Sequence, residues 1–102
     1  MSYTALLEMK FKEDRLEAVK DAMSRILPES RQFDGCEGMT AHQSADDPTV
    51  VVVLERWASD EQQAAYSAYR QKQMADGPCD TATVISSLAA PPSMRRLEDF
   101  AV

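Results

Sequence analysis

Residues 50–57 read VVVVLERW and are followed at once by Ser59-Asp60-Glu61-Gln62, and this stretch decides the fold. The β-branched run is typical of a strand that is buried on both faces. Ser59 and Gln62 form a capping box, so we expect a helix directly after the strand. A strand buried on both faces needs two covers, and 102 residues supply only a couple of helices. We therefore expect a homodimer, in which a second copy covers the sheet face that the helices leave open.

The N-terminal third predicts a strand followed by a helix. Apolar residues occupy the odd positions of residues 3–11, which is the alternation of a strand with one apolar face. Apolar residues then recur at helical spacing over residues 16–27, with Asp14 and Glu17 as a capping pair at the start. Pro28 is expected to end or kink this helix.

The rest of the chain predicts four more elements and a tail. These are a strand from Cys36 to Ser44 that forms a hairpin with the strand Thr49 to Trp57, a helix to about Met74 that stops at Gly77-Pro78, a strand from Thr81 to Ala89, and a short helix or arm from Met94 to Phe100. The order β-α-β-β-α-β is that of the ferredoxin-like split βαβ fold. We expect one α+β domain over residues 1–102, with a four-stranded antiparallel sheet that forms a dimeric α/β barrel.

Composition excludes several partners. The net charge is -6, and the 11 Lys and Arg residues are scattered along the chain, which argues against nucleic acid and anionic membranes. Cys36 and Cys79 lie far apart with no zinc-site spacing, so we expect two reduced thiols and no metal. No stretch approaches the roughly 20 apolar residues of a membrane span, and the start lacks a basic leader. We expect a soluble cytoplasmic protein.

Several features together resemble one known family. They are the Gly35-Cys36 step after the first helix, the Glu55-Arg56-Trp57 strand end, the Ser59-Asp60-Glu61 helix start and the order of elements. This combination is similar to the antibiotic biosynthesis monooxygenase domain, over nearly the whole chain. The resemblance implies a dimeric α+β barrel with a pocket in each subunit between the sheet and the helices. Because that barrel serves enzymes of several kinds, the resemblance says more about fold than about reaction.

The resemblance also implies an activity, although this chain departs from the family pattern at several residues. Active members include cofactor-independent oxygenases of polycyclic phenols, quinone-forming monooxygenases and haem-degrading enzymes. Trp57 matches the family tryptophan that lines the pocket in the cofactor-free type. Val53 stands where the phenol oxygenases carry an asparagine, and Tyr66 stands where many members carry a histidine. The asparagine and helical histidine of the haem-degrading branch are absent, because His42 is the only histidine. Haem degradation is therefore disfavoured.

Three residues are the catalytic candidates. Oxygenation without a cofactor needs an electron-rich substrate that, once deprotonated, gives an electron to molecular oxygen, so the protein must exclude water and handle a proton. His42 is the one side chain whose ordinary pKa suits proton abstraction near neutrality, unless it is a surface strand residue. Trp57 offers a flat wall and an N–H donor, or else simply fills the core. Tyr66 is the alternative proton-handling group.

Three further residues are candidates for substrate binding. Tyr69 and Arg70 share a helix face with Tyr66, and Arg70 would polarise a substrate oxygen unless it is merely solvated. Met39, like the other internal methionines, is expected to fill core or pocket space against a flat ligand. Glu55 is expected either to pair with an arginine such as Arg56 of the partner subunit at the dimer seam or to serve as a base of raised pKa.

Two classes of function follow. The first is a cofactor-independent monooxygenase acting on a small phenol or quinone-type aromatic. The alternative is a non-enzymatic dimeric binding or stress-response protein of the same fold, which the missing asparagine and histidine favour. An isomerase or decarboxylase on the same barrel is a third reading, recognised by product formation without oxygen.

Overall fold

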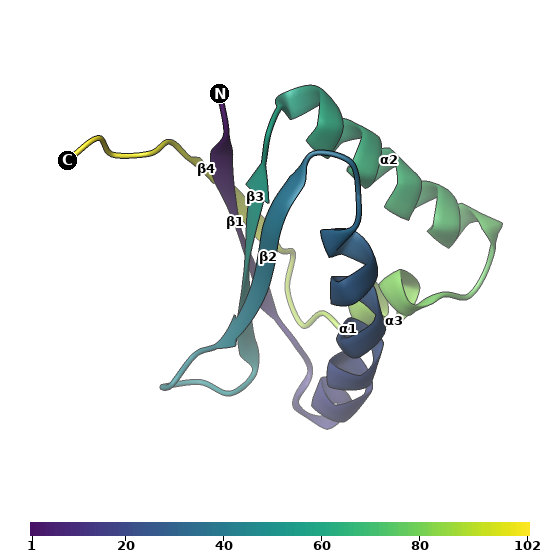
Figure 1. The fold of residues 1–102 in the computed structure, drawn as a ribbon. Helices are drawn as coiled ribbons and strands as arrows, with labels where there is room; N and C mark the ends of the chain where they lie inside the picture. The colour runs from purple at the N-terminus through teal and green to yellow at the C-terminus, as the bar shows by residue number, and fades with distance from the viewer.

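Four strands form one antiparallel sheet in the computed structural model, which describes residues 1–102, and all three α-helices lie on one face of that sheet (Figure 1). The elements in chain order are β1 (Tyr3–Lys10), a 3-10 turn η1 (Glu13–Arg15), α1 (Leu16–Arg31), β2 (Cys36–Gln43), β3 (Val50–Trp57), α2 (Asp60–Asp76), α3 (Asp80–Ser86) and β4 (Ser93–Leu97). The strand order is β2-β3-β1-β4. This arrangement confirms the α+β, ferredoxin-like fold class.

The strand register decides which side chains meet the helices. In the β1–β3 pair, Ala5 lies opposite Glu55 and Leu7 lies opposite Val53. Both strands therefore present their odd-numbered residues to the same face, which is the helix-covered one. Its centre is the core, where Tyr3, Phe11 and Trp57 are at most 1% exposed.

The other sheet face carries the even-numbered residues of β1 and β3. The aliphatic side chains on this face are Leu6, Val50, Val52, Leu54 and Leu97, and we call them the outer-face patch. Leu97 is 36% exposed, and the other four are half-buried. No element of the chain covers this face (Figure 1).

The first helix departs from prediction at both ends. Its N-cap is Arg15, which makes no side-chain capping hydrogen bond, so the predicted Asp14 cap is wrong; the chain enters α1 through η1 instead. Pro28 lies in the last turn and does not end the helix, because α1 continues to Arg31. A proline in the last turn removes a single N–H from the helix, and the Ser30 hydroxyl adds a bond to the Ile26 carbonyl at 2.8 Å.

The predicted strand over residues 81–89 is wrong. Residues 80–86 form α3, whose N-cap is Cys79 with its thiol accepting from the Ala82 N–H at 3.4 Å. The β-branched composition obscured a helical spacing of Thr81, Val84 and Leu88. The helix is favoured because that spacing lets Val84 pack, 6% exposed, into the core on the helix side of the sheet.

The fourth strand is formed by residues that were expected to be a helix or arm. β4 pairs antiparallel with β1, with Met94 opposite Leu7 and Arg96 opposite Ala5. The Arg96 guanidinium lies over the Tyr3 ring, 3.8 Å from the ring centroid. Beyond β4 the chain end extends away from the domain (Figure 1).

The start of α2 follows the predicted capping chemistry. The Ser59 hydroxyl accepts a hydrogen bond from the Gln62 N–H at 3.2 Å and donates to the Gln62 side chain at 3.0 Å. Gly35, which has φ +86°, packs so closely that a Cβ there would lie 2.4 Å from Gln62. These contacts fix the end of β3 and the origin of α2. No helix is long and apolar enough to cross a membrane.

Candidate functional site

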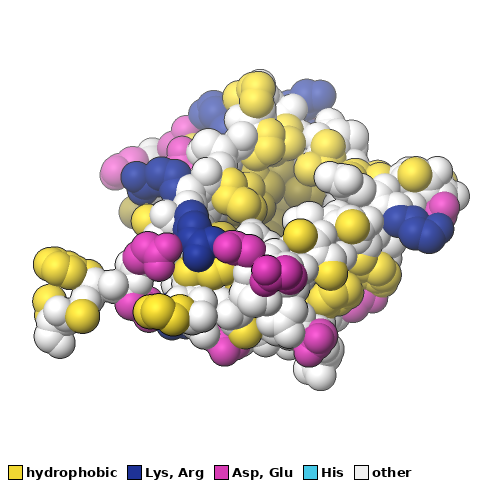
Figure 2. Space-filling view, turned by 90° about the horizontal axis from the view of Figure 1, so that it is seen from above, with side chains coloured by type: hydrophobic (Ala, Val, Ile, Leu, Met, Phe, Trp, Pro, Cys, Tyr) yellow, Lys and Arg dark blue, Asp and Glu magenta, His cyan; other side chains and the backbone are white.

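A cavity of about 260 Å³ lies between the helix-covered face of the sheet and the helices, and twelve of its sixteen lining residues are hydrophobic. Side chains from β1, β2, β3 and β4 form its sheet side, and all three α-helices contribute to the opposite wall. Ser67, Ile85 and Met94 are the exposed members of the lining and mark the mouth. In the view from above, hydrophobic side chains surround a hollow between the sheet and α2 (Figure 2). We call this space the central cavity.

Methionine dominates the lining of the central cavity. Five of the six methionines of the chain take part, namely Met9, Met23, Met39, Met74 and Met94. Met39 is 3% exposed and lies where the sequence predicted, on the pocket side of β2. Unbranched thioether side chains adapt to flat and irregular ligands, so the wall suits a planar apolar molecule.

Glu55 is the one acidic residue of the cavity lining. It is 5% exposed, and its Oε1 accepts a hydrogen bond of 2.8 Å from the Trp57 Nε1–H. The side chain forms no ion pair and accepts no second hydrogen bond. Burial raises the pKa of Glu55 above its ordinary value, and the hydrogen bond from Trp57 opposes that rise only in part. Glu55 therefore faces the cavity and not the outer face, which excludes the predicted pairing at a seam through that face.

Trp57 supports the cavity from behind. Its side chain is 0% exposed and does not belong to the lining. The ring packs against Tyr66, with centroids 5.1 Å apart, and its N–H is used by Glu55. A direct stacking role for Trp57 therefore finds no support in this geometry, and the aromatic wall of the cavity is Tyr66.

Tyr66 and Arg70 meet as the sequence predicted, but their polar groups turn toward α1. The Tyr66 hydroxyl lies 2.7 Å from the Ser30 hydroxyl and accepts from Arg70 Nε at 3.1 Å. The other four N–H groups of Arg70 bind Glu29, Gln73, Ser30 and the Ile26 carbonyl. A guanidinium has five donors, and all five are occupied here. Arg70, 8% exposed, thus joins α1 to α2 and has no donor left for a ligand.

Tyr69 lies on the same helix face as Arg70, outside the central cavity. Its ring lies beneath the Arg70 guanidinium, 5.3 Å from the ring centroid, and packs on Phe33. Its hydroxyl accepts from Gln73 at 3.0 Å. The structure therefore places Tyr69 with the α1–α2 contact and not with the cavity.

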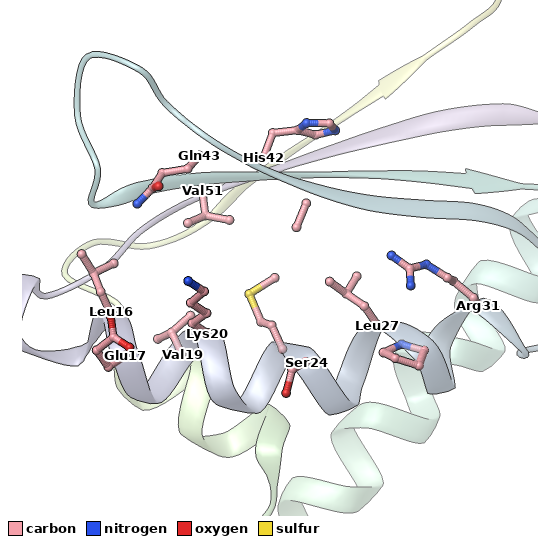
Figure 3. Close-up of a pocket in the computed structure, with 13 residues that line it drawn as sticks. Leu16, Glu17, Val19, Lys20, Ser24, Leu27, Arg31, His42, Gln43 and Val51 are labelled. Carbon is pink, nitrogen blue, oxygen red and sulfur yellow. The ribbon is translucent and has the colours of Figure 1, made fainter.

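His42 is not brought together with the other candidates. It borders a separate groove of about 610 Å³ between α1 and β2, but its ring lies on the opposite side of the sheet from α1, whereas Val51 points toward α1 (Figure 3). The ring is exposed and bonds to Thr40 on the same outer face, with Oγ1 and Nε2 2.9 Å apart. His42 therefore does not lie where its predicted proton-transfer role in the cavity of the same subunit requires.

Two polar groups of the cavity were missed or left undecided by sequence reasoning. The Thr81 hydroxyl is buried and has no hydrogen-bond partner, and it lines the cavity. Its segment was predicted as a strand, so no pattern singled out Thr81 as a cavity residue. Glu55 was considered, and the available signal was a carboxylate placed within an otherwise β-branched buried strand. No group of three or more His, Cys, Asp or Glu side chains is placed to hold a metal ion.

The sequence profile of the antibiotic biosynthesis monooxygenase family matches residues 2–75, from β1 to the end of α2. The chain belongs to this family. Val53 and Tyr66, which occupy the positions where the resemblance predicts an asparagine and a histidine, both line the central cavity. Their substitution therefore changes the cavity itself.

Solved structures show the same fold over the full chain. A candidate antibiotic biosynthesis monooxygenase from Nitrosomonas europaea is 24% identical, with a TM-score of 0.83 over 96% of this chain and 89% of that one. A conserved protein from Methanosarcina mazei is 10% identical, with a TM-score of 0.84 over 98% and 94%. A candidate monooxygenase of the same family from Chloroflexus aurantiacus is 18% identical, with a TM-score of 0.75 over 100% and 96%. At these identities the likeness concerns the fold. None of the curated proteins matches the chain.

Proposed function

We propose that the protein is a monooxygenase that acts, without a metal or flavin cofactor, on a small phenol or quinol bound in the central cavity. The observation that carries the proposal is the cavity itself: it is apolar, rich in methionine and supplied with one buried carboxyl group, in a chain of the antibiotic biosynthesis monooxygenase family. A planar aromatic ring fits such a wall, and a hydroxyl on that ring has Glu55 or Thr81 as a partner.

The size of the cavity restricts the substrate. A volume of about 260 Å³ lies just below the roughly 300–1,000 Å³ typical of pockets for drug-sized ligands. We therefore expect one ring or two fused rings, as in hydroxylated benzenes and naphthalenes. Larger polycyclic phenols would require the mouth residues Ile85 and Met94 to move.

The chemistry needs little from the protein. Once deprotonated, an electron-rich phenol can transfer an electron to molecular oxygen. The substrate supplies all four electrons that reduce O₂: one oxygen atom enters the ring, which loses two hydrogen atoms and becomes a quinone, and the other oxygen atom leaves as water. The protein's contribution is to hold the ring, to limit access of water and to take up the proton. Twelve hydrophobic lining residues serve the second task, and Tyr66 offers an aromatic face for the first.

We also propose that the chain forms a homodimer through the outer-face patch. This patch is contiguous across β3, β1 and β4, because Leu54 pairs with Leu6 and Thr4 pairs with Leu97. Half-buried valine and leucine side chains on an uncovered sheet face favour association with a matching surface, and a second copy presents one. Phe100, 88% exposed on the chain end, adds apolar area beyond the sheet.

Oxygen consumption tests the proposed function. Metal-stripped protein is given hydroxylated benzenes and naphthalenes under air and under nitrogen, and products are followed by mass. We expect oxygen-dependent turnover and a product with one added oxygen atom. Binding at one molecule per subunit without any product would instead identify the alternative, a dimeric binding or stress-response protein.

That alternative rests on a specific observation. Val53 and Tyr66 replace two polar groups that the resemblance predicts in the cavity wall, and the Tyr66 hydroxyl is already bonded to Ser30 and Arg70. A cavity with fewer free polar groups is better suited to retention of a hydrophobic metabolite than to catalysis. Product formation that continues under nitrogen would point to an isomerase or decarboxylase.

A further inference from the structure

Glu55 differs from every other carboxylate of the chain in its surroundings. It is the only Asp or Glu side chain that is buried, and it carries no ion pair. Buried carboxylates are usually paired or fully hydrogen-bonded, since desolvation of the charge is costly. Here one oxygen atom, Oε1, accepts from Trp57, and the carboxyl group lines the central cavity with Oε2 free of any partner in the protein. The free oxygen is positioned for a group that enters the cavity.

The neighbours of Glu55 supply no cation. Tyr3 on β1 and Cys36 on β2 are the titratable groups near it on the adjacent strands, and burial raises the pKa of both, so they remain neutral. From α2, Tyr66 and Arg70 face the cavity, but all donors of Arg70 are used by other partners. The lining residues from α1, α3 and β4 carry no titratable group. Glu55 is thus the one carboxyl group of the cavity lining, and no cation of the lining is free to pair with it.

Trp57 determines where the Glu55 carboxyl group lies. The two side chains project from the same face of β3, two residues apart, and the indole N–H donates to Oε1 at 2.8 Å. The indole is itself fixed, because it is 0% exposed and packs against Tyr66. A rigid donor on one oxygen leaves the other oxygen oriented into the cavity.

We propose that Glu55 is the catalytic base of the protein and that Trp57 is its positioning residue. In the step we assign, the O–H bond of the bound phenol breaks and a new O–H bond forms to the free oxygen of Glu55. The negative charge passes from the carboxylate to the phenol oxygen, so the cavity holds one negative charge before and after the step. This inference rests on the proposed function, because it presumes a phenolic ligand in the central cavity. The raised pKa of Glu55 supports it, since a base works best when its pKa lies near the working pH.

The proton transfer can be observed without turnover. The probe is 4-nitrophenol, whose phenolate absorbs visible light while its neutral form is nearly colourless. We compare the absorption of the bound probe in the wild type and in Glu55→Gln, at the pH where the free probe is half ionised. The wild type is expected to hold a larger fraction of phenolate than the variant. Equal fractions in both proteins, with binding retained, would overturn the role of Glu55 and leave the proposed function standing.

Failure of the wild type to bind the probe overturns the proposed small-phenol site and, with it, this inference. The two failures are therefore distinguishable. If Glu55→Gln does not fold, Trp57→Phe takes its place, because it keeps the carboxyl group and an aromatic ring at position 57 but removes the fixed donor. For that variant we expect a phenolate fraction different from that of the wild type, and an unchanged fraction would contradict the positioning role.

A second readout uses Trp57 as the only tryptophan of the chain. Its N–H donates to a carboxylate at high pH and to a neutral carboxylic acid at low pH, so its fluorescence should titrate with Glu55. We expect a transition with a midpoint above the ordinary glutamate pKa of about 4.5 in the wild type, and none in Glu55→Gln. A purely structural Glu55 that never changes ionisation would give the same flat profile in both proteins.

Kinetics complete the test once a substrate is known. Removal of a general base lowers kcat by roughly 10²-fold or more. We expect this loss in Glu55→Gln with little change in KM, because the ring is still held by the methionine-rich wall. A loss confined to KM would identify Glu55 as a binding group and contradict the assigned step.

Discussion

Glu55 and Trp57 show how neighbouring residues on one strand divide their tasks. Both point to the helix-covered face of β3, yet Glu55 reaches the central cavity and Trp57 lies behind the wall. The alternation of a strand predicts the face on which a side chain lies but not its depth, so the sequence could not separate the two. For His42 even the face was open, because an irregularity between Cys36 and Gly38 shifts the register of β2 against β3.

The ionisation of Glu55 should make stability depend on pH. Its folded pKa is raised, so the wild type binds this proton more tightly when folded and loses stability as the pH rises from about 4.5 through the folded pKa. Glu55→Gln lacks that loss. We expect the free energy of unfolding of the variant, relative to the wild type, to increase across this pH window, measured by urea unfolding at several pH values.

The comparison of the wild type with Glu55→Gln isolates the ionisation of Glu55. Asp47, which pairs with Lys10 and whose pKa is lowered to about 2, titrates equally in both proteins, as do the carboxylates that pair with surface arginines, such as Asp21. Their contributions therefore cancel in the difference. A difference that stays constant between pH 4 and 8 would mean that Glu55 is not desolvated as described.

Replacement of Trp57 should affect both stability and Glu55. Trp57→Phe removes the only hydrogen bond of a buried carboxyl group, which costs about 1–3 kcal/mol in the free energy of unfolding. The pKa of Glu55 should rise further, because the bond from Trp57 favours the ionised form. Denaturant unfolding measures the first effect, and the pH dependence of stability measures the second. An unchanged pH profile would argue against the contact.

Among the elements, those defined by clear periodicity were predicted well and those defined by composition were not. Strands β1, β2 and β3 and helix α2 lie where alternation, turn residues and capping chemistry indicated. The segment of α3 was misassigned because its threonine, valine and isoleucine residues suggested a strand, although helical packing against the core decides such a short element. β4 was missed because strand pairing with β1, and not its own residues MRRL, makes it a strand.

The α1–α2 contact depends on Arg70. Its five hydrogen bonds reach Glu29, Ser30 and the Ile26 carbonyl on α1 and two side chains on its own helix. Arg70→Met removes all of them, so that the Tyr66 hydroxyl keeps only Ser30 as a partner and the Ser30 hydroxyl keeps Tyr66 and the Ile26 carbonyl. We expect a loss on the order of 3 kcal/mol in the free energy of unfolding.

Glu29→Gln is the matched control for Arg70→Met. The Glu29 side chain is 53% exposed, and exposed ion pairs contribute at most about 1 kcal/mol. Thermal unfolding of both variants should therefore show a large shift for Arg70→Met and a small one for Glu29→Gln. Equal small shifts would indicate that Arg70 is a solvent-facing side chain.

For the whole molecule, the main open question is what covers the outer face of the sheet. A sheet with helices on one side exposes its other face to water, and here that face carries the outer-face patch (Figure 1). Leu54→Lys places a charge within the patch, between Leu6 and Thr40 on the adjacent strands. We expect the wild type to sediment as a dimer and the variant as a monomer in analytical ultracentrifugation, because a buried unpaired lysine is costly.

Ala68→Lys provides the corresponding control, since Ala68 is exposed on α2, away from the patch. It should remain dimeric. A wild type that sediments as a monomer over the micromolar range would contradict the proposed interface, whereas a dimer that survives Leu54→Lys would move the interface to another surface.

Incorporation of isotopic oxygen into product tests most directly whether the protein oxygenates a phenol in the central cavity. Variants at the mouth of the cavity show whether the reaction takes place there. Wild type, Ser67→Phe and Ala68→Phe are each incubated with a hydroxylated naphthalene under ¹⁸O₂, and labelled product is measured by mass. Ser67 lines the mouth and Ala68 does not, although both are exposed on α2. We predict one ¹⁸O atom per product in the wild type and in Ala68→Phe, and a loss of roughly tenfold or more in Ser67→Phe, as for a blocked pocket. Equal labelling in all three proteins, or none in the wild type, would contradict oxygenation in the central cavity.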